Sequence, residues 1–156
     1  LPEKPDYVFS GINCGYNAGF DIAYSGTIGA AMEGVMNGIP AIAFSAQHDG
    51  SFDVAEAHLL PIARELIALG QDAGEVWNVN FPGCALEDFK GILRGRSICK
   101  TCLYDNKYTQ ERLPDGSLKL TISGKPVSPD TVPEGCDVRA VLDGYISIGK
   151  VRSMVL

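Results

Sequence analysis

A glycine-rich segment near the start of the chain carries amide side chains at a spacing that suits ligand binding. Glycines stand at positions 11, 15 and 19, with Asn13 and Asn17 between them. Glycine lets the backbone approach a ligand closely, and a short Asn side chain offers both an acceptor and donors. Asn17 has an equally good alternative explanation, because Asn tolerates a left-handed turn without binding anything. The segment predicts a loop whose amides contact an anion or a metal ion.

A helix start follows this segment and would complete an anion site. Ser25, Gly26 and Thr27 are typical of a helix N-terminus, and we expect the helix to run to about Asn37, where Gly38 ends it. The first N–H groups of a helix have no partner within it, and the helix dipole favours negative charge there. No Lys follows, so this is not the GxxxxGK[ST] phosphate loop, and the glycine spacing does not match GxGxxG. These residues alone predict a site for a phosphate-like anion.

The elements on either side of the loop predict a strand–loop–helix–strand unit. Residues 7–9 read as a short apolar strand that Ser10 and Gly11 are expected to end, and residues 39–45 as a second apolar strand. In such a unit the loop and the helix N-terminus lie at the carboxyl edge of the sheet, where open α/β sheets bind their ligands. The anion site is therefore expected at this edge.

The rest of the chain predicts another helix and strand, then an extended region. Residues 53–69 have helical periodicity, with Pro61 expected to kink or break the helix, and residues 76–81 alternate as in a half-buried strand. A hairpin is expected around a turn at 113–117, and a last strand at 145–148. Because an isolated hairpin is unstable, we expect this one to pack on a partner.

Composition and charge exclude several classes of protein. The chain has 156 residues, a length that suits one domain, and its net charge of −6 argues against a nucleic-acid polymer as the main partner. No apolar run reaches the length of a membrane span, and the first residues show no export signal, so we expect a cytoplasmic protein with no membrane partner. Five cysteines, an odd number, favour reduced thiols.

The cysteines also have a metal-binding interpretation. Cys99 and Cys102 form a CxxC pair that could hold a structural zinc ion together with Cys84 and Cys136. There is no second CxxC at the usual spacing of a zinc ribbon, so we interpret the thiols as incidental.

Other polar residues have both a chemical and a structural interpretation. We interpret His48 as a surface loop residue rather than a general acid or base, and Glu33 as a structural carboxylate rather than a catalytic one. Arg94 and Arg96 suit a solvated strand face, with a bidentate phosphate clamp as the alternative. Two aromatic side chains could stack on a base, namely Tyr104 and Tyr108.

Five stretches of the sequence together resemble one known family. They are SGINCGYNAG (10–19), YSGTIGAAMEG (24–34), GIPAIAFS (38–45), NVNFP (78–82) and DVRAVLDGYISI (137–148). On these motifs the chain resembles the SurE family of survival proteins, which are metal-dependent 5′-nucleotidases. The likeness extends over nearly the whole chain.

The resemblance implies an α/β fold with three layers, a Rossmann-like, mostly parallel sheet and a C-terminal β-hairpin extension. It implies a single domain over residues 1–156, with residues 86–135 as a hairpin extension used for oligomerisation into a homodimer or homotetramer. Family members begin with a strand that ends in an Asp-Asp pair, and this sequence does not contain it. The chain therefore resembles the last two thirds of the family fold.

The chemistry is also implied by the resemblance. Asn13 matches the amide ligand of the family's divalent metal ion, Mg²⁺ or Mn²⁺. Asn17, Ser25, Gly26 and Thr27 match positions that line its phosphate pocket. The implied activity is that of an acid-phosphatase-like phosphomonoesterase, which hydrolyses nucleoside 5′-monophosphates to nucleoside and phosphate.

Two departures from the family pattern leave a second hypothesis open. The acidic pair has no counterpart here, so the catalytic residues are unassigned, and Cys14 stands where the family often has Arg. The alternative is a non-catalytic chain that acts as a phosphate- or nucleotide-binding module or as an assembly module.

Overall fold

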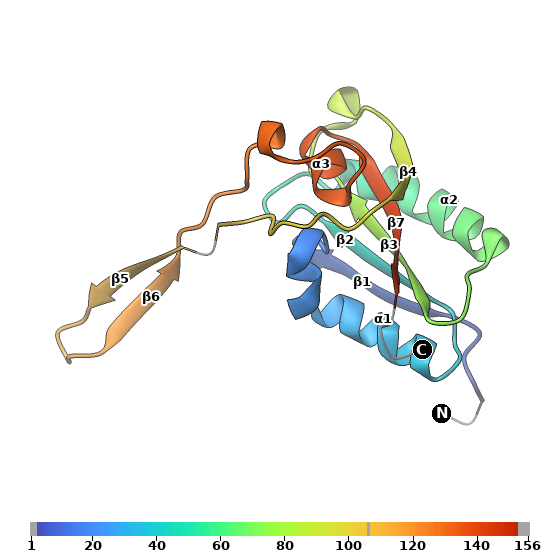
Figure 1. Cartoon of the computed structure of the whole chain (residues 1–156), viewed down its shortest axis with the longest axis horizontal. Coiled ribbons are helices and arrows are strands. Elements are labelled where there is room, and N and C mark those ends of the chain that lie inside the picture. Colours follow the sequence, from blue (N-terminus) through green and yellow to red (C-terminus); the bar gives the residue numbers. More distant parts are fainter. Residues whose placement is uncertain (1–2, 106, 153–156) are drawn as a thin grey trace.

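The computed structural model describes residues 3–105 and 107–152, and a five-stranded sheet organises them (Figure 1). The strand order is β1-β2-β3-β7-β4. Neighbouring strands are parallel except where β7 meets β3, which gives the mostly parallel α/β sheet expected from the sequence. The strands are β1 (Val8–Cys14), β2 (Ala41–Ala46), β3 (Glu75–Phe81), β4 (Ile92–Arg96) and β7 (Ile146–Arg152).

Helices cover both faces of the sheet and make three layers. Helix α1 (Gly26–Met36) packs its apolar side chains against Ala41 and Ala43 of β2. Helix α2 (Asp53–Leu69) packs against Ile42 and Phe44 of the same strand, which point to the opposite face. This alternation of side chains along one fully buried strand is what a sheet with two covered faces requires. A short helix, α3 (Asp137–Leu142), leads into β7.

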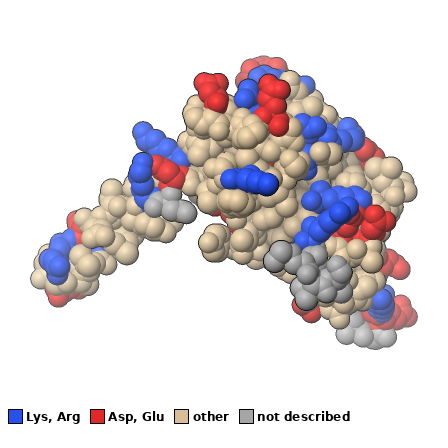
Figure 2. Space-filling model, in the orientation of Figure 1, with Lys and Arg blue, Asp and Glu red and all other residues tan. Residues whose placement is uncertain are grey.

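A two-stranded hairpin projects from this body (Figure 1). Strand β5 (Tyr108–Arg112) pairs antiparallel with β6 (Leu118–Ile122), and every residue of both strands is exposed. The turn expected at 113–117 is present, with the Asp115 carboxylate accepting a hydrogen bond from the Ser117 N–H at 2.9 Å. In the space-filling view the hairpin is an arm with charged side chains at its tip and at its base (Figure 2).

The first strand is longer than expected. It continues past Gly11 to Cys14, because Asn13 and Cys14 pair with Ser45 and Ala46 of β2 after an irregularity in register. Gly11 was expected to end the strand, but pairing with β2 extends the strand beyond it. β1 forms one edge of the sheet, and the side chains of Phe9 and Ile12 are 53% and 38% exposed.

The structure corrects two further expectations, the half-burial of β3 and a break of the helix at Pro61. β3 is more deeply buried than expected: it lies between β2 and β7, all its residues except the half-buried Trp77 are buried, and these include Asn78 and Asn80. The helix over residues 53–69 does not break at Pro61. Pro61 lies on the exposed side of α2, so its ring stays clear of the core while the next residue, Ile62, is buried in it.

Three smaller elements complete the described chain: the 3₁₀ turns η1 (Gly19–Tyr24), η2 (Leu86–Asp88) and η3 (Pro129–Thr131). No helix within residues 3–105 and 107–152 combines the length and the apolar character needed to cross a bilayer.

Candidate functional site

The residues that the sequence singled out for ligand binding line one cavity of about 650 Å³. Asn13 comes from the end of β1, Asn17 from the loop that follows, and Ser25, Gly26 and Thr27 from the start of α1. The cavity lies at the carboxyl end of β1, as expected for an open α/β sheet. The other lining residues are Gly15, Tyr16, Asp21, Tyr24, Tyr104 and Ile122.

The start of α1 presents hydrogen-bond donors to this cavity. Ser25 is the N-cap, and its Oγ accepts a hydrogen bond from the Ile28 N–H at 3.1 Å. The N–H groups of Gly26 and Thr27 donate to no acceptor among the hydrogen bonds of the described residues. Two free N–H groups and the positive end of an eleven-residue helix suit a phosphate-like anion.

Asn17 joins the loop to the helix start. The Ser25 hydroxyl donates to Asn17 Oδ1 at 2.6 Å, and the Asn17 side chain is almost fully buried. Asn17 Nδ2 is a buried donor that has no partner among the described residues. An unpaired buried donor is costly, so an oxygen of a bound ligand would satisfy it.

The backbone of Asn17 is held by side chains from the two neighbouring strands. Its N–H donates to Asn80 Oδ1 at 2.8 Å and to Ser45 Oγ at 3.1 Å. Its carbonyl accepts from Asn78 Nδ2 at 2.7 Å and Asn80 Nδ2 at 3.1 Å. Asn78 and Asn80 therefore have a structural role, and no local pattern in the sequence indicates that Asn17 is their shared partner.

Asp137 is a second anchor of the cavity wall that sequence reasoning missed. Its buried carboxylate accepts hydrogen bonds from the N–H groups of Gly19 at 3.0 Å, Cys99 at 2.8 Å and Val138 at 2.8 Å. Burial raises the pKa of Asp137, and the three N–H donors oppose that shift. The carboxylate thereby ties the loop after β1 to the segment 99–105, which we call the strap.

The described residues offer only part of a metal site. Asn13 Nδ2 donates to the Gly15 carbonyl at 2.7 Å, which leaves Asn13 Oδ1 as an available oxygen. Asp21 is the only carboxylate among the described residues that lines the cavity, and its Oδ2 already accepts from the Leu103 N–H at 2.7 Å. No group of three or more His, Cys, Asp or Glu side chains suited to a metal occurs within residues 3–105 and 107–152. One amide and one engaged carboxylate do not match the oxygen-rich shell of Mg²⁺ or Mn²⁺.

Of the remaining candidates, His48, Glu33 and Tyr108 lie apart from the cavity lining and Tyr104 belongs to it. His48 stands beside Asp49 at 3.6 Å on the exposed loop after β2. The Glu33 carboxylate accepts from Asn37 Nδ2 at 3.0 Å near the end of α1, in agreement with the structural role expected of it. Tyr104 lines the cavity, whereas Tyr108 belongs to the projecting hairpin.

The cysteines do not converge on a metal site in the part of the chain that the structure describes. All five are free thiols. Cys99 and Cys136 are buried, and burial raises the pKa of Cys99 to about 12. A protonated, buried thiol packs as a small apolar side chain, so these residues contribute to the core below the strap.

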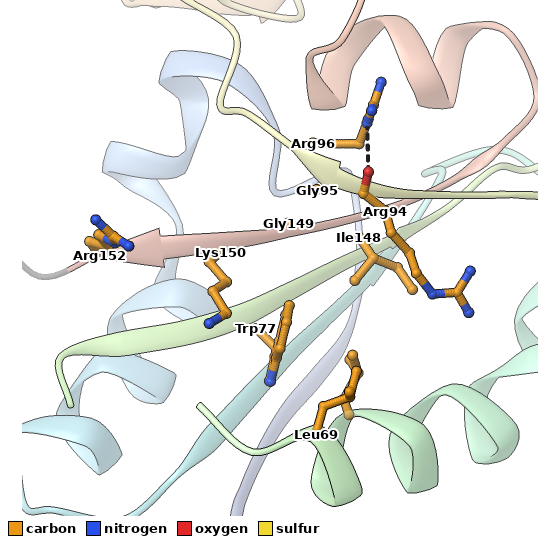
Figure 3. A pocket seen from close by; sticks show the side chains of 10 residues that line it. Leu69, Trp77, Arg94, Gly95, Arg96, Ile148, Gly149, Lys150 and Arg152 are labelled. Carbon is orange, nitrogen blue, oxygen red and sulfur yellow. Dashed lines mark hydrogen bonds between the residues drawn. The ribbon is translucent and has the colours of Figure 1, made fainter. Parts of the chain in front are cut away.

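A second cavity, of about 370 Å³, lies between α2 and the strands β3, β4 and β7 (Figure 3). It shares no lining residue with the first cavity, and four cationic side chains border it: Arg94, Arg96, Lys150 and Arg152. Arg94 is engaged by the Glu65 carboxylate through two bonds of 2.7 and 2.6 Å, and Arg96 donates to the Arg94 carbonyl at 3.2 Å. The phosphate-clamp alternative for Arg94 therefore has no support here, because its guanidinium already binds a carboxylate.

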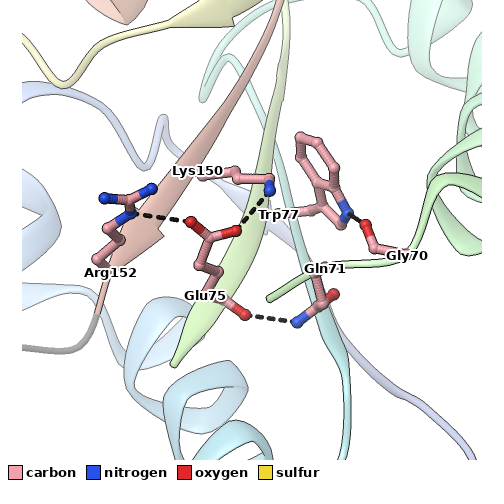
Figure 4. A network of polar contacts seen from close by, with 6 residues as sticks. All are labelled: Gly70, Gln71, Glu75, Trp77, Lys150 and Arg152. Atoms are coloured by element: carbon pink, nitrogen blue, oxygen red, sulfur yellow. Dashed lines mark hydrogen bonds and ion pairs between the residues drawn. The ribbon is translucent and has the colours of Figure 1, made fainter. Parts of the chain in front are cut away.

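Glu75 binds the other two cations (Figure 4). Its carboxylate is only 3% exposed and accepts from Lys150 Nζ at 2.5 Å and Arg152 Nε at 2.8 Å. Lys150 Nζ also stands 4.7 Å from the ring centroid of Trp77. The hydrogen bond from Lys150 is the largest cause of a lowered pKa at Glu75. These contacts fasten β7 to β3.

The Glu75 pairs predict a pH-dependent stability. Because folding lowers the pKa of Glu75 from its ordinary 4.5, its ionised form stabilises the fold above pH 4.5, and this contribution is lost as the pH falls through the folded value. We expect Glu75→Gln to lower the free energy of unfolding by roughly 1–2 kcal/mol at pH 7, with the deficit shrinking at pH 3. Urea denaturation at both pH values measures this. Glu65→Gln, at a more exposed pair, is the control and should cost less than about 1 kcal/mol. A Glu75→Gln deficit that is equally large at pH 3 would contradict the role given to the charge.

The anchoring of Asn17 predicts unequal effects of two substitutions in β3. Asn80→Ala leaves the Asn17 N–H and the Ser45 hydroxyl each without their Asn80 partner, whereas Asn78→Ala removes one bond to the Asn17 carbonyl. We expect Asn80→Ala to lower the free energy of unfolding by roughly 2–3 kcal/mol, and by about 1 kcal/mol more than Asn78→Ala. Urea unfolding of the matched pair measures the difference. Equal losses would show that Asn80 does not hold the loop.

Comparison with known proteins gives a consistent result. The sequence model described as "Survival protein SurE" matches residues 1–107. A protein named 5′-nucleotidase SurE from Flavobacterium psychrophilum is 35% identical over 157 residues and matches 97% of this chain, and 5′-nucleotidase SurE 1 from Thermus thermophilus is 38% identical with the same coverage. The chain spans 59% of the length of each of these relatives.

A solved structure agrees with the sequence comparison. The crystal structure of SurE protein from Aquifex aeolicus is 35% identical to this chain and has a TM-score of 0.74. The match covers 97% of this chain and 60% of that one. By its sequence motifs, its fold and its relatives, this chain belongs to the SurE family.

Proposed function

We propose that this chain forms the phosphate-binding part of a metal-dependent 5′-nucleotidase, a phosphomonoesterase that converts nucleoside 5′-monophosphates to nucleoside and phosphate. One observation carries the proposal: the five residues expected to bind phosphate or metal line a single cavity at the N-terminus of α1. The names of the relatives, which are 5′-nucleotidases, support the reaction class.

In this proposal the chain's own residues bind and orient the phosphoryl group. The N–H groups of Gly26 and Thr27 and the buried Asn17 Nδ2 would donate to its oxygens. Donors fixed before the ligand arrives stabilise the negative charge that builds up on these oxygens during hydrolysis. The hydrogen bond from Ser25 to Asn17 joins the helix start to the loop, so it fixes the positions of these donors relative to one another.

The metal would need ligands beyond those that the described residues supply. We assign Asn13 Oδ1 as one ligand, and a bound divalent ion would supply Lewis acidity to the reaction. Carboxylates for the ion would come from the part of the relatives' length that this chain does not span. The free edge of β1, with exposed Phe9 and Ile12, is a surface against which such a segment could pack.

A non-catalytic phosphate- or nucleotide-binding module remains the second candidate. It is favoured by the small number of carboxylates around the cavity in the described residues. Release of phosphate from a nucleoside 5′-monophosphate with Mg²⁺ or Mn²⁺ separates the two candidates. Binding of phosphate without any release under either metal would favour the module.

The helix start provides the sharpest test of phosphate binding. Gly26→Pro removes one N–H donor at the first helical position, where Pro fits a helix and the extended conformation of Ser25 suits a residue before Pro. We expect the dissociation constant for inorganic phosphate, measured by calorimetry, to rise about tenfold relative to Gly26→Ala, since the lost bond is charge-assisted. Gly26→Ala is the matched comparison, because it keeps the N–H and its Cβ would meet no atom within 4 Å. Equal affinities of the two variants would refute the anion site.

We also propose that the protein assembles through its hairpin and acts in the cytoplasm. Leu118, Leu120 and Ile122 alternate along β6 and are 54%, 58% and 75% exposed, so the β6 side of one face of the arm is apolar and unpartnered among the described residues. Their cross-strand neighbours on that face are Arg112, Gln110 and Tyr108 of β5. The opposite face carries Thr121 and the Lys119–Glu111 ion pair. A second copy of the chain would cover the apolar face and give a homodimer or homotetramer. The free thiols fit a reducing compartment.

The two faces of β6 give a matched test of assembly. Leu120→Glu places a charge on the apolar face, and Thr121→Glu places the same charge on the polar face. Analytical ultracentrifugation of the protein should show that Leu120→Glu weakens self-association at least tenfold, because a buried unpaired charge is unfavourable. The Thr121→Glu variant should associate like the wild type. A wild-type protein that is monomeric at all concentrations tested would refute the assembly.

A further inference from the structure

The cavity has two chemically different ends. Amide and hydroxyl donors stand at the start of α1. Besides Asn13, Gly15 and Asp21, the wall also contains four aromatic or apolar side chains: Tyr16, Tyr24, Tyr104 and Ile122. These four come from separate segments, namely the loop after β1, the turn η1, the strap and the end of β6. A volume of about 650 Å³ exceeds what a phosphate ion alone would fill.

Tyr104 is the best-held aromatic group of this wall. Its neighbours in the strap are pinned on both sides: the Leu103 N–H donates to Asp21 at 2.7 Å, and the Leu103 carbonyl accepts from the Val127 N–H at 2.9 Å. The Asp105 N–H donates to the Lys125 carbonyl at 3.1 Å. The side chain of Tyr104 is half-buried and packs against the buried cluster that includes Leu103. A ring held in this way loses little conformational freedom when a ligand stacks on it.

The other two tyrosines are less suited to the same role. Tyr24 is 87% exposed, so no packing holds its ring in place. The hydroxyl of Tyr16 donates to Gln47 Oε1 at 3.2 Å, and burial raises the pKa of Tyr16. Tyr16 is therefore packed into the wall of the cavity, and its ring is less available for a base to stack on.

Charge sets the direction in which an anionic ligand would lie. Burial raises the pKa of Tyr104, and the carboxylates of Asp49 and Asp21 lie close enough to raise it further, so the phenol is neutral. The same carboxylates repel a phosphate from the aromatic end. The free N–H groups of Gly26 and Thr27 attract it to the other end.

We propose that Tyr104 is the nucleoside-recognising residue of this cavity, where its ring stacks on the base of a nucleoside 5′-monophosphate whose phosphate lies at the start of α1. This inference rests on the proposed function and adds a specificity to it. Stacking accepts any base, since every base has a π face. The site therefore distinguishes a nucleotide from a sugar phosphate, but it discriminates little between purine and pyrimidine.

The test is a set of calorimetric titrations with inorganic phosphate, ribose 5-phosphate, AMP and UMP. The wild-type protein should bind AMP and UMP about tenfold more tightly than ribose 5-phosphate, as expected for one stacked base. Tyr104→Ala should lose this preference and keep its affinity for inorganic phosphate, which also shows that the cavity is still folded. Tyr104→Phe should retain the preference, because the ring and not the hydroxyl is required. Tyr108→Ala, on the arm outside the cavity lining, should behave as the wild type.

The outcomes separate this inference from the function on which it rests. A wild type that binds phosphate but shows no preference for AMP over ribose 5-phosphate overturns the role of Tyr104 and leaves the phosphate site standing. A Tyr104→Ala variant that keeps the preference also overturns it. A wild type that binds none of the four compounds overturns the proposed function, and the inference falls with it.

Discussion

The fastening of Asn17 to the neighbouring strands is the interaction on which the site depends. Both polar groups of its peptide backbone are buried, and they are paired with Asn78, Asn80 and Ser45 instead of with a strand ladder. Buried backbone groups must find partners, so these side chains fix where the loop after β1 can lie. The bond from Ser25 to Asn17 Oδ1 then sets the position of the loop relative to the start of α1.

The opposite wall of the cavity is held by similar means. Asp137 collects three N–H groups from segments that are far apart along the chain, and Asp21 holds the strap through Leu103. In both cases a carboxylate replaces the regular pairing that an irregular segment cannot provide. Gly19 shows how closely the segments approach: with φ of +58°, its position would place a Cβ 2.3 Å from the Thr101 carbonyl oxygen. The cavity is thus bounded by irregular backbone that polar side chains keep in place.

The arm and the cavity share a boundary. Tyr104 lies just before the hairpin and Ile122 ends its second strand, and both line the cavity. The pairing of Tyr104 with Pro126 closes the base of the arm beside the cavity. The arm is therefore joined directly to the strap, whose residue Tyr104 would contact the base of a nucleotide in the proposed complex.

The sequence correctly predicted the elements that depend on interactions between residues close together in the chain. The cap at Ser25, the helix that follows, the apolar strand β2 and the hairpin turn at Asp115 all appeared where the sequence placed them, because capping, periodicity and turn chemistry involve residues within a few positions of one another. The full length of β1 and the burial of Asn78 and Asn80 in β3 were missed. Both depend on which strands lie alongside, and Asn78 and Asn80 look like solvent-facing residues until the loop that they bind is present.

By itself, the sequence determined the family, the order of the main helices and strands, and five residues that line one cavity at the start of α1. Only the tertiary structure decided that Asp137 and Asn80 hold the walls, that Tyr104 rather than Tyr108 meets the cavity, and that Arg94 is engaged by Glu65. The physical reason is that a buried polar group takes its partners from whatever segments are packed beside it. Those partners lie 63 residues away for Asn80 and up to 118 for Asp137, beyond the reach of any local pattern.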